Sequence, residues 1–372
     1  MTVTTSRHTA LHDEHAALGA SFTDFGGWDM PLKYGSELAE HRAVRDAAGL
    51  FDLSHMGEVR VTGPDAATFL NTALVGNLAA IAVGRAKYSL ICTPDGGIID
   101  DLISYRLAED EYLVVPNAGN APTVFAALQE RAAGFDVTVA DESADTSLVA
   151  VQGPSAQALL QELVPAEQQQ LVAELKYYSA APATVAGIDV LLARTGYTGE
   201  DGFELYVGNE QAVPLWKALL EAGQGHGLVP CGLACRDSLR LEAGMPLYGQ
   251  ELTRDLTPYE AGLGPVVSFK KEEDFVGRAA LESRKAAGVA RTLVGLRGEG
   301  RRAARGHYPI SVDGSVVGEV TSGALSPTLG YPIAMAYLDN EHAEPGTEVQ
   351  VDLRGKPVPF EVVSLPFYQR GQ

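Results

Sequence analysis

The chain has 372 residues, of which 46% are hydrophobic and 20% charged, and its 48 acidic and 28 basic residues give a net charge of −20. This length predicts about two or three domains with a sizeable core. Nucleic-acid binding is not expected, because it needs a basic surface against the phosphates, and the acidity disfavours anionic membranes. Three cysteines without a CxxC pair make a disulfide framework unlikely on chemical grounds.

The N-terminal stretch MTVTTSRHTALHDEH lacks the apolar core of a signal peptide, and the chain has no run of about 18 apolar residues. We therefore expect a cytoplasmic protein without a membrane segment. The pattern of residues 7–20 predicts a short helix. A loop rich in aromatic residues and glycine is predicted at 24–36, and a second helix at 36–48. Residues 50–63 alternate like a strand from about Gly57, and Pro64 opens a further helix.

The clearest β region is 84–117, where KYSLIC, IIDDLISYRL and YLVVPN predict three antiparallel strands joined by turns. Helical patterns follow at 121–133, 154–164, 211–226 and 236–251, with strands at 146–152 and 187–194. The order lacks regular βαβ spacing, so we predict an α+β fold. After a charged stretch at 270–291 only short strands and turns occur, which predicts a small separate β-barrel.

Two adjacent aspartates interrupt the second strand of this β region. Period-two alternation places Asp101 on a face with Ile99 and Tyr105, and Asp100 on a more polar face with Arg106. A carboxylate among apolar neighbours is costly unless it is paired, and such carboxylates cluster at active sites. An aspartate that caps a neighbouring loop remains the structural alternative.

Two further stretches are candidates for ligand binding. RTGYTGEDGFE, 194–204, has three glycines but matches neither GxGxxG nor a P-loop, so a Gly-rich hairpin or wide turn is the simpler interpretation. Arg236 and Arg240 lie four apart in a predicted helix and share a face, which is either solvated or grips carboxylates.

Metal and triad chemistry are not predicted. His12 and His15 are spaced to share a helix face, and SHM at 54–56 adds a histidine, but no further ligand cluster of suitable spacing follows. Cys231 and Cys235 are expected to be buried as small hydrophobic side chains. No G-x-S-x-G motif supports a catalytic triad.

The chain resembles the aminomethyltransferase (T-protein) family of the glycine cleavage system. The resemblance runs in family order through DFGGWDMPLKYGS, HRAVRDAAGLFDLSHMGEVRVTGPDA, KYSLICTPDGGIIDDLISY, VQGP, RTGYTGEDGFELYV, RDSLRLEAGMPLYGQEL, DFVGRAAL and TSGALSPTLGYPIAMAY. It implies a three-domain cloverleaf around a folate site, with a Greek-key barrel as the third domain. We expect residues 1–50 plus 140–270 to contribute to the folate site, 51–139 to carry Asp101, 271–290 to form a linker and 291–372 to form the barrel.

The resemblance also implies a reaction. A one-carbon unit passes from the S-aminomethyl-dihydrolipoyl arm of the H-protein to tetrahydrofolate, giving 5,10-methylenetetrahydrofolate, ammonia and the dihydrolipoyl H-protein. Tetrahydrofolate is then a co-substrate, the lipoylated H-protein is the partner, and no metal is implied. The acidic carrier is expected to dock on the basic run 301–305.

The same resemblance assigns roles to single residues. It implies that Asp101 is the catalytic carboxylate over the folate N10 and that Glu204 and Arg236 grip the folate. The remaining ligand-binding residues that it implies are the pocket aromatics Tyr88, Tyr105 and Tyr197, Met56 and Asn117 at the pterin end, Arg370 at the glutamate tail, and Arg305 as a cation from the barrel.

Two rivals share the implied fold. The folate-binding half of sarcosine or dimethylglycine oxidases follows a flavin domain, and this chain has no dinucleotide fingerprint. The non-enzymatic folate-binding proteins of iron–sulfur assembly carry a cysteine in a K-G-C-Y-like motif, whereas the corresponding stretch here, EAGMPLYGQE, has none. The sequence therefore favours the transferase.

Overall fold

The computed structural model describes residues 6–371, which form two compact units. The first unit comprises the described residues up to Phe69, Leu78–Lys87 and Leu102–Asp237. The second comprises Leu70–Asn77, Tyr88–Asp101 and the described residues from Ser238 onward. Both units are therefore discontinuous in sequence. Within 6–371, no helix has the length and hydropathy needed to cross a membrane.

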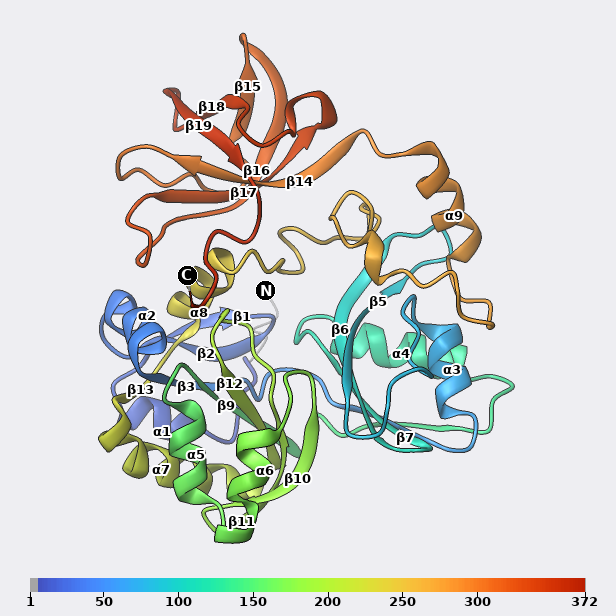
Figure 1. Cartoon of the computed structure of the whole chain (residues 1–372), viewed down its shortest axis with the longest axis vertical. Helices are drawn as coiled ribbons and strands as arrows, with labels where there is room; N and C mark the ends of the chain where they lie inside the picture. Colours follow the sequence, from blue (N-terminus) through green and yellow to red (C-terminus); the bar gives the residue numbers. More distant parts are fainter. Residues whose placement is uncertain (1–5, 372) are drawn as a thin grey trace. The chain divides into compact units, whose positions relative to one another are not determined.

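A six-stranded sheet forms the centre of the first unit. Its order is β10-β11-β12-β9-β3-β13, and the pairing is antiparallel except between β13 and β3. The strands are β3 (Ala48–Asp52), β9 (Thr146–Gln152), β10 (Ala180–Val185), β11 (Ile188–Ala193), β12 (Gly202–Gly208) and β13 (Leu228–Pro230). The helices α5 (Ala156–Leu163) and α7 (Asn209–Gly223) pack against the sheet, and α6 (Gln169–Glu174) packs against α5 (Figure 1). The predicted strands at 146–152 and 187–194 and the helices at 154–164 and 211–226 are confirmed.

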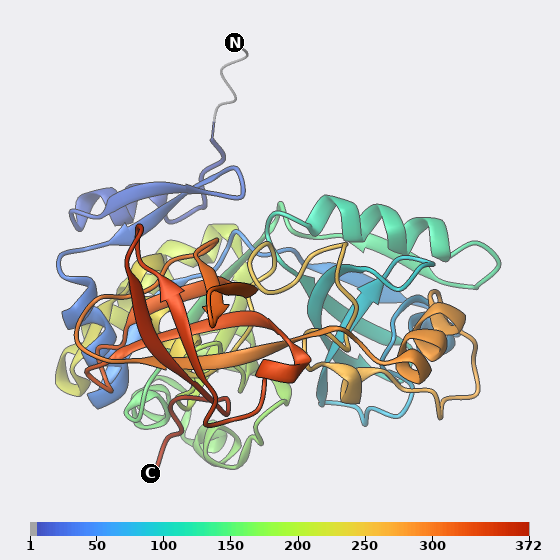
Figure 2. The same cartoon turned by 90° about the horizontal axis from the view of Figure 1, so that it is seen from above.

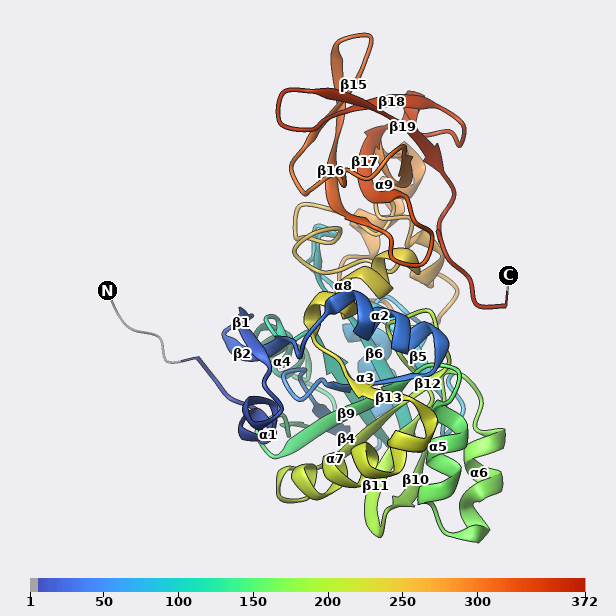
Figure 3. The same cartoon turned by 90° about the vertical axis from the view of Figure 1, so that its left-hand side faces the viewer.

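The first unit starts with α1 (His12–Ala17), a hairpin of β1 (Ser21–Phe25) and β2 (Trp28–Lys33), and α2 (Glu37–Asp46). Figure 3 shows α1 beside the hairpin. The predicted helices are confirmed, but the predicted loop at 24–36 is wrong. Gly26 and Gly27 have φ of +60° and +85°, so they form the two-residue turn that joins tightly paired strands.

A five-stranded sheet has the order β5-β6-β7-β4-β8. Its strands are β4 (Val59–Thr62), β5 (Ala86–Cys92), β6 (Ile98–Ala108), β7 (Glu111–Pro116) and β8 (Thr138–Asp141), and the nearby helices are α3 (Ala66–Ala73) and α4 (Ala121–Arg131). The three predicted strands of 84–117 are neighbours in the predicted order. The helix α4, teal in Figure 2, packs beside β8, and its buried residues are Val124 and Leu128.

The second unit contains a closed six-stranded barrel, drawn in orange to red in Figure 1. Its strands are β14 (Arg291–Gly298), β15 (Pro309–Val312), β16 (Ser315–Leu325), β17 (Pro332–Asp339), β18 (Glu348–Asp352) and β19 (Pro357–Val363). The consecutive strands β15, β16 and β17 are neighbours in the barrel, and β17 lies beside β14, the strand that precedes all three in the chain. The strand β14 also pairs with β19, which closes the barrel. This is the order that the predicted Greek-key barrel requires. Leu296, Val320, Ala336 and Val351 are among the fully buried side chains of its core.

Along the sequence, the α-helices α8 and α9 follow β13 and precede the first strand of the barrel. The helix α9 (Arg278–Ala287) lies within the predicted linker 271–290. The helix α8 (Leu233–Glu242) ends well before residue 251, so the predicted helix over 236–251 is wrong in its second half. Gly244 has a φ of +65° and Pro246 follows, and both residues stop a helix.

Candidate functional site

Asp101 lies on β6 with a hydroxyl donor from the neighbouring strand. The Tyr88 hydroxyl on β5 donates to Asp101 Oδ2 over 3.0 Å. Both side chains are half-buried, so neither is sealed off from a ligand. A hydroxyl donor on one carboxylate oxygen fixes the orientation of the carboxylate.

The burial of the two aspartates differs from the sequence-based expectation. Asp100 is 0% exposed, as are Ile98 and Ser104 on its face of β6, whereas Asp101 is half-buried. The more apolar residue types on the Asp101 face therefore did not mark the more buried side of the strand. The alternation could not show that the other face is covered from Ile98 to Ser104, because a serine and an arginine gave it a polar pattern. Asp101 is nevertheless the aspartate that a ligand can reach.

The chain that precedes Asp101 is fixed by a distant segment of the second unit. The Ile98 amide donates to Leu256 O over 3.1 Å, and the Tyr248 hydroxyl donates to Ile98 O over 3.0 Å. A Cβ on Gly97 would lie 2.0 Å from Arg254 O, so only glycine allows this approach. These contacts give Asp101 a rigid backbone.

Glu204 on β12 is the centre of a hydroxyl network in the first unit. Its Oε2 atom accepts hydrogen bonds from Thr195 Oγ1 and, over 3.4 Å, from the Tyr105 hydroxyl. The Tyr105 hydroxyl is also 2.9 Å from Thr195 Oγ1, and its ring meets Tyr206 edge-on at 5.8 Å. Because both hydroxyls bind Oε2, Glu204 Oε1 is left for another donor. Tyr105 is 0% exposed, so its contact to a ligand in this arrangement runs through Glu204.

Arg236, in the same unit, places a cation beside Tyr197. Its guanidinium lies 4.6 Å from the centre of the Tyr197 ring, in a cation–π contact. Burial raises the pKa of Glu204, while the Thr195 hydroxyl and the charge of Arg236 lower it and offset part of that rise. Burial, followed by the charge of Arg236, lowers the pKa of His55 to about 4, so His55 is neutral at pH 7. The sequence flagged His55 only as a metal ligand and missed this neutral, buried role.

Gln152 holds the glycine-rich stretch 194–204 in place. Its Nε2 donates to Thr195 O over 3.1 Å, and its Oε1 accepts from Thr198 Oγ1 over 2.9 Å. A Cβ on Gly196 would lie 2.0 Å from Gln152 Oε1, and one on Gly202 would lie 2.4 Å from Nε2. The glycines are therefore needed because an amide side chain passes against them. The predicted wide turn is confirmed, because this stretch joins the antiparallel strands β11 and β12. The role of Gln152 was not predicted.

Other predicted residues are distributed over both units. In the first unit, the Gly57 amide donates to Pro116 O over 3.1 Å, so the segments carrying Met56 and Asn117 lie side by side. In the second unit, Arg370 is exposed, and the Tyr368 amide near it donates to Glu242 O over 2.8 Å. Arg305 is exposed and donates to Gly323 O over 3.0 Å.

Arg240 and the two cysteines are internal. Of the two alternatives for the Arg236 and Arg240 face, the solvated one does not hold for Arg240, which is 2% exposed and pairs with the Glu251 carboxylate over 2.9 Å. Cys231 and Cys235 are free and buried, as expected. Burial raises the pKa of the Cys231 thiol well above its usual range, so it is not a reactive thiolate.

Comparison with known families decides the relationship. Residues 11–271 match the family described as GCVT N-terminal domain, and residues 291–369 match the glycine cleavage T-protein C-terminal barrel domain. The chain belongs to the glycine cleavage T-protein family.

Individual T-proteins resemble it over their full length. A Streptomyces avermitilis protein named aminomethyltransferase is 62% identical over 370 residues, which is 98% of each chain. A Bacillus subtilis protein of the same name is 46% identical and covers 98% of this chain and 99% of its own. The crystal structure of glycine cleavage system aminomethyltransferase T from Bartonella henselae superposes with a TM-score of 0.90, at 38% identity and 98% coverage of both chains. The T-protein fold predicted from the sequence is therefore confirmed.

Proposed function

We propose that the protein is a tetrahydrofolate-dependent aminomethyltransferase of the glycine cleavage system. It takes the one-carbon unit from the S-aminomethyl-dihydrolipoyl H-protein and gives 5,10-methylenetetrahydrofolate, ammonia and the dihydrolipoyl H-protein. The observation that carries the proposal is the full-length similarity to proteins named aminomethyltransferase. The pairing of Tyr88 with a reachable Asp101 supports it.

The chemistry needs a base near a weakly nucleophilic amine. Two bonds of the transferred carbon break, one to the lipoyl sulfur and one to the amino nitrogen, and two form, to N5 and N10 of the folate. The protons of N5 and N10 leave with the thiol and the ammonia. We assign Asp101 to accept the N10 proton and to stabilise the positive charge that develops there. Tyr88 keeps the carboxylate oriented.

The first unit supplies groups suited to a folate. Glu204 Oε1 is available to the N–H donors of a pterin ring, because the Thr195 and Tyr105 hydroxyls both occupy Oε2. Arg236, stacked on Tyr197, provides a cation for the same ligand. We assign Tyr105 the positioning of Glu204.

The remaining assignments keep the roles that the resemblance implies. Met56 and Asn117 contact the pterin end, and Arg370 the glutamate tail. The partner is the lipoylated H-protein, and the exposed cations Arg301, Arg302 and Arg305 are its proposed docking site, since an acidic carrier is attracted to them.

The decisive experiment follows ammonia release from aminomethyl-loaded H-protein with tetrahydrofolate, and measures tetrahydrofolate binding separately. Asp101→Asn is expected to slow release by about 10²- to 10⁴-fold, as for loss of a general base, while binding changes little. Asp95→Asn is the matched control, because Asp95 is exposed on the turn before β6. Normal ammonia release by the Asp101→Asn variant would contradict the role assigned to Asp101.

The same assay tests the alternative of a non-enzymatic folate-binding protein. That alternative predicts tetrahydrofolate binding without folate-dependent ammonia in the unmodified protein. No specific observation in the structure favours it.

A further inference from the structure

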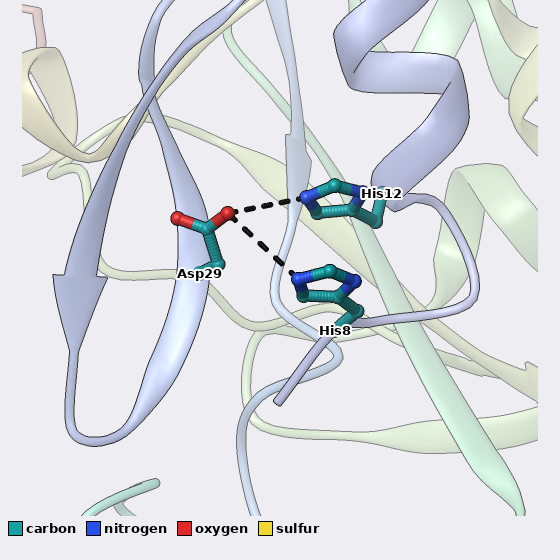
Figure 4. Close-up of side chains that lie close together, drawn as sticks. All are labelled: His8, His12 and Asp29. Carbon is teal, nitrogen blue, oxygen red and sulfur yellow. Dashed lines mark hydrogen bonds and ion pairs between the residues drawn. The ribbon is translucent and has the colours of Figure 1, made fainter. Parts of the chain in front are cut away.

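The histidine cluster of the N-terminal part is complete in itself. His12 Nε2 lies 3.2 Å from Asp29 Oδ2, and the rings of His8 and His12 stack with their planes 3° apart (Figure 4). Lone pairs lie in the ring plane, so two parallel, stacked rings cannot both direct a nitrogen at one ion. His15, which the sequence suggested as a partner of His12, is instead 2.9 Å from Asp52 Oδ2. These side chains therefore need no ligand.

Three hydroxyl groups, by contrast, lie in a row that ends on a carboxylate with one oxygen still to be used. The Thr195 hydroxyl donates to Glu204 Oε2, and the Tyr105 hydroxyl is 2.9 Å from Thr195 Oγ1. At the far end the Tyr206 hydroxyl donates to the Tyr105 hydroxyl over 3.5 Å, the longest contact of the row. The residues come from the loop before β12, from β6 and from β12 itself, so only the folded unit assembles the row.

The direction of the protons in this row follows from the donors that each group has. An ionised carboxylate only accepts, so the single hydroxyl proton of Thr195 is directed at Glu204. Thr195 Oγ1 then accepts from Tyr105, whose 3.4 Å contact to Glu204 Oε2 is the longer of its two. Hydrogen bonds that point the same way polarise one another, which strengthens the last bond, from Thr195 to the carboxylate.

The row is buried, and its members have little freedom to turn away. Thr195 is 3% exposed, Tyr105 0% and Tyr206 5%. The two tyrosine rings meet edge-on at 5.8 Å, and Gln152 Nε2 donates to the Thr195 carbonyl over 3.1 Å. Water therefore has no easy access to replace the Thr195 hydroxyl as a donor.

The row acts on one side of Glu204 only. Both hydroxyl donors lie on Oε2, which stops the carboxylate from rotating and leaves Oε1 to a ligand. Burial raises the pKa of Glu204, and the Thr195 hydroxyl opposes this rise, followed by the charge of Arg236 and the Tyr105 hydroxyl. Thr195 is thus the group that most directly holds the acceptor in place.

We infer that Thr195 is the positioning residue of Glu204, and that the hydroxyl row behind it keeps this carboxylate oriented for the N–H donors of a pterin. The inference rests on the proposed folate site and adds what holds its acceptor. A carboxylate that is oriented before binding costs the ligand less ordering. Because Glu204 is assigned to the pterin and not to the reacting carbon, Thr195 acts on folate binding and not on the transfer step.

The test measures the Kd of tetrahydrofolate by calorimetry, and then KM and kcat for ammonia release from aminomethyl-loaded H-protein. Thr195→Val removes the hydroxyl at a similar side-chain shape. It is expected to raise Kd and KM for tetrahydrofolate by about 2- to 12-fold, the factor for ordering one side chain on binding, at an unchanged kcat. Thr195→Ser returns the hydroxyl and is expected to restore both values, which a loss of packing alone would not allow.

Thr184→Val is the matched control. The Thr184 hydroxyl also donates to a carboxylate of the first unit, Asp189 over 3.0 Å, but Asp189 is exposed on β11. This variant is expected to keep Kd, KM and kcat. If Thr195→Val does not fold, Tyr105→Phe decides, because it removes the hydroxyl that donates to Thr195, and the same rise in Kd is expected.

The two readouts separate this inference from the proposed function. An unmodified protein that does not bind tetrahydrofolate contradicts the proposed function. If the unmodified protein binds it, three results overturn the positioning role of Thr195: an unchanged Kd in Thr195→Val, a fall in kcat at an unchanged KM, or an equal loss in Thr195→Ser.

Discussion

The close approach between Gln152 and Gly196 predicts a strong coupling between two substitutions. In Gly196→Ala the new Cβ lies 2.0 Å from Gln152 Oε1, a separation that atoms cannot keep. The Gln152 side chain must swing away and give up its bonds to Thr195 O and Thr198 Oγ1. Shortening Gln152 to alanine removes the clash in advance.

The magnitudes follow from these contacts. Gly196→Ala costs about 1–3 kcal/mol for overpacking and about 1 kcal/mol for each of two lost hydrogen bonds, which is about 3–5 kcal/mol. Gln152→Ala leaves a buried carbonyl and a hydroxyl without their partner, which costs about 2–4 kcal/mol. The double variant is expected to cost about the same as Gln152→Ala alone. The coupling free energy then equals the cost of Gly196→Ala, about 3–5 kcal/mol, at or above the upper end for residues in contact.

Urea unfolding of the four proteins measures this cycle. Gly225→Ala is the control, because a Cβ there meets nothing within 4 Å, and it is expected to be additive with Gln152→Ala. If Gly196→Ala and Gln152→Ala add to within about 0.5 kcal/mol, the close approach does not determine the need for glycine at this position.

Three further predictions test other parts of the chain. Burial raises the pKa of Glu58, so the stability that its protonated form contributes is complete below the unfolded pKa and is lost as pH rises through the folded one. Glu58→Gln should therefore gain in urea resistance over wild type as the pH rises above about 5, by about 1.4 kcal/mol per unit of pKa difference, and parallel pH profiles would exclude this. Glu251→Gln removes the negative charge that pairs with buried Arg240 and should lower the free energy of unfolding by about 3–5 kcal/mol. Glu361→Gln, in an exposed pair, should lower it by less than about 1 kcal/mol. Equal losses would argue against a stabilising role of the buried pair. Tyr88→Phe should slow ammonia release about tenfold at an unchanged unfolding midpoint, since it removes only the hydroxyl that donates to Asp101, the proposed catalytic carboxylate. An unchanged rate would count against a role for that donor.

The sequence predicted what local patterns determine and missed what distant residues determine. The strands of 84–117 were clear, because their apolar runs are bounded by turns such as PDGG. The β1–β2 hairpin was taken for a loop, because Asp24, Asp29 and Pro31 weaken its strand pattern. β3 was overlooked because its five residues, all buried, show no alternation.

The candidate site shows the same limit. The family resemblance pointed to Asp101, while the alternation argument misjudged which aspartate is buried, since β6 is covered on the Asp100 side by residues that alternation does not reveal. Gln152 and Thr195 received no role, because each acts on residues that only the fold brings near.

The discontinuity of the second unit has a consequence during synthesis on the ribosome. Leu90 and Ile98, in the stretch that leads to Asp101, are fully buried in a core with Leu252 and Leu281, which emerge more than 150 residues later. At about 5–20 residues per second, these side chains wait about 8–30 s for their partners, longer than most helices and hairpins need to form. The first unit has all its residues once Asp237 is made. The segment Tyr88–Asp101, which carries the proposed catalytic carboxylate, therefore completes its core only after most of the chain has been made.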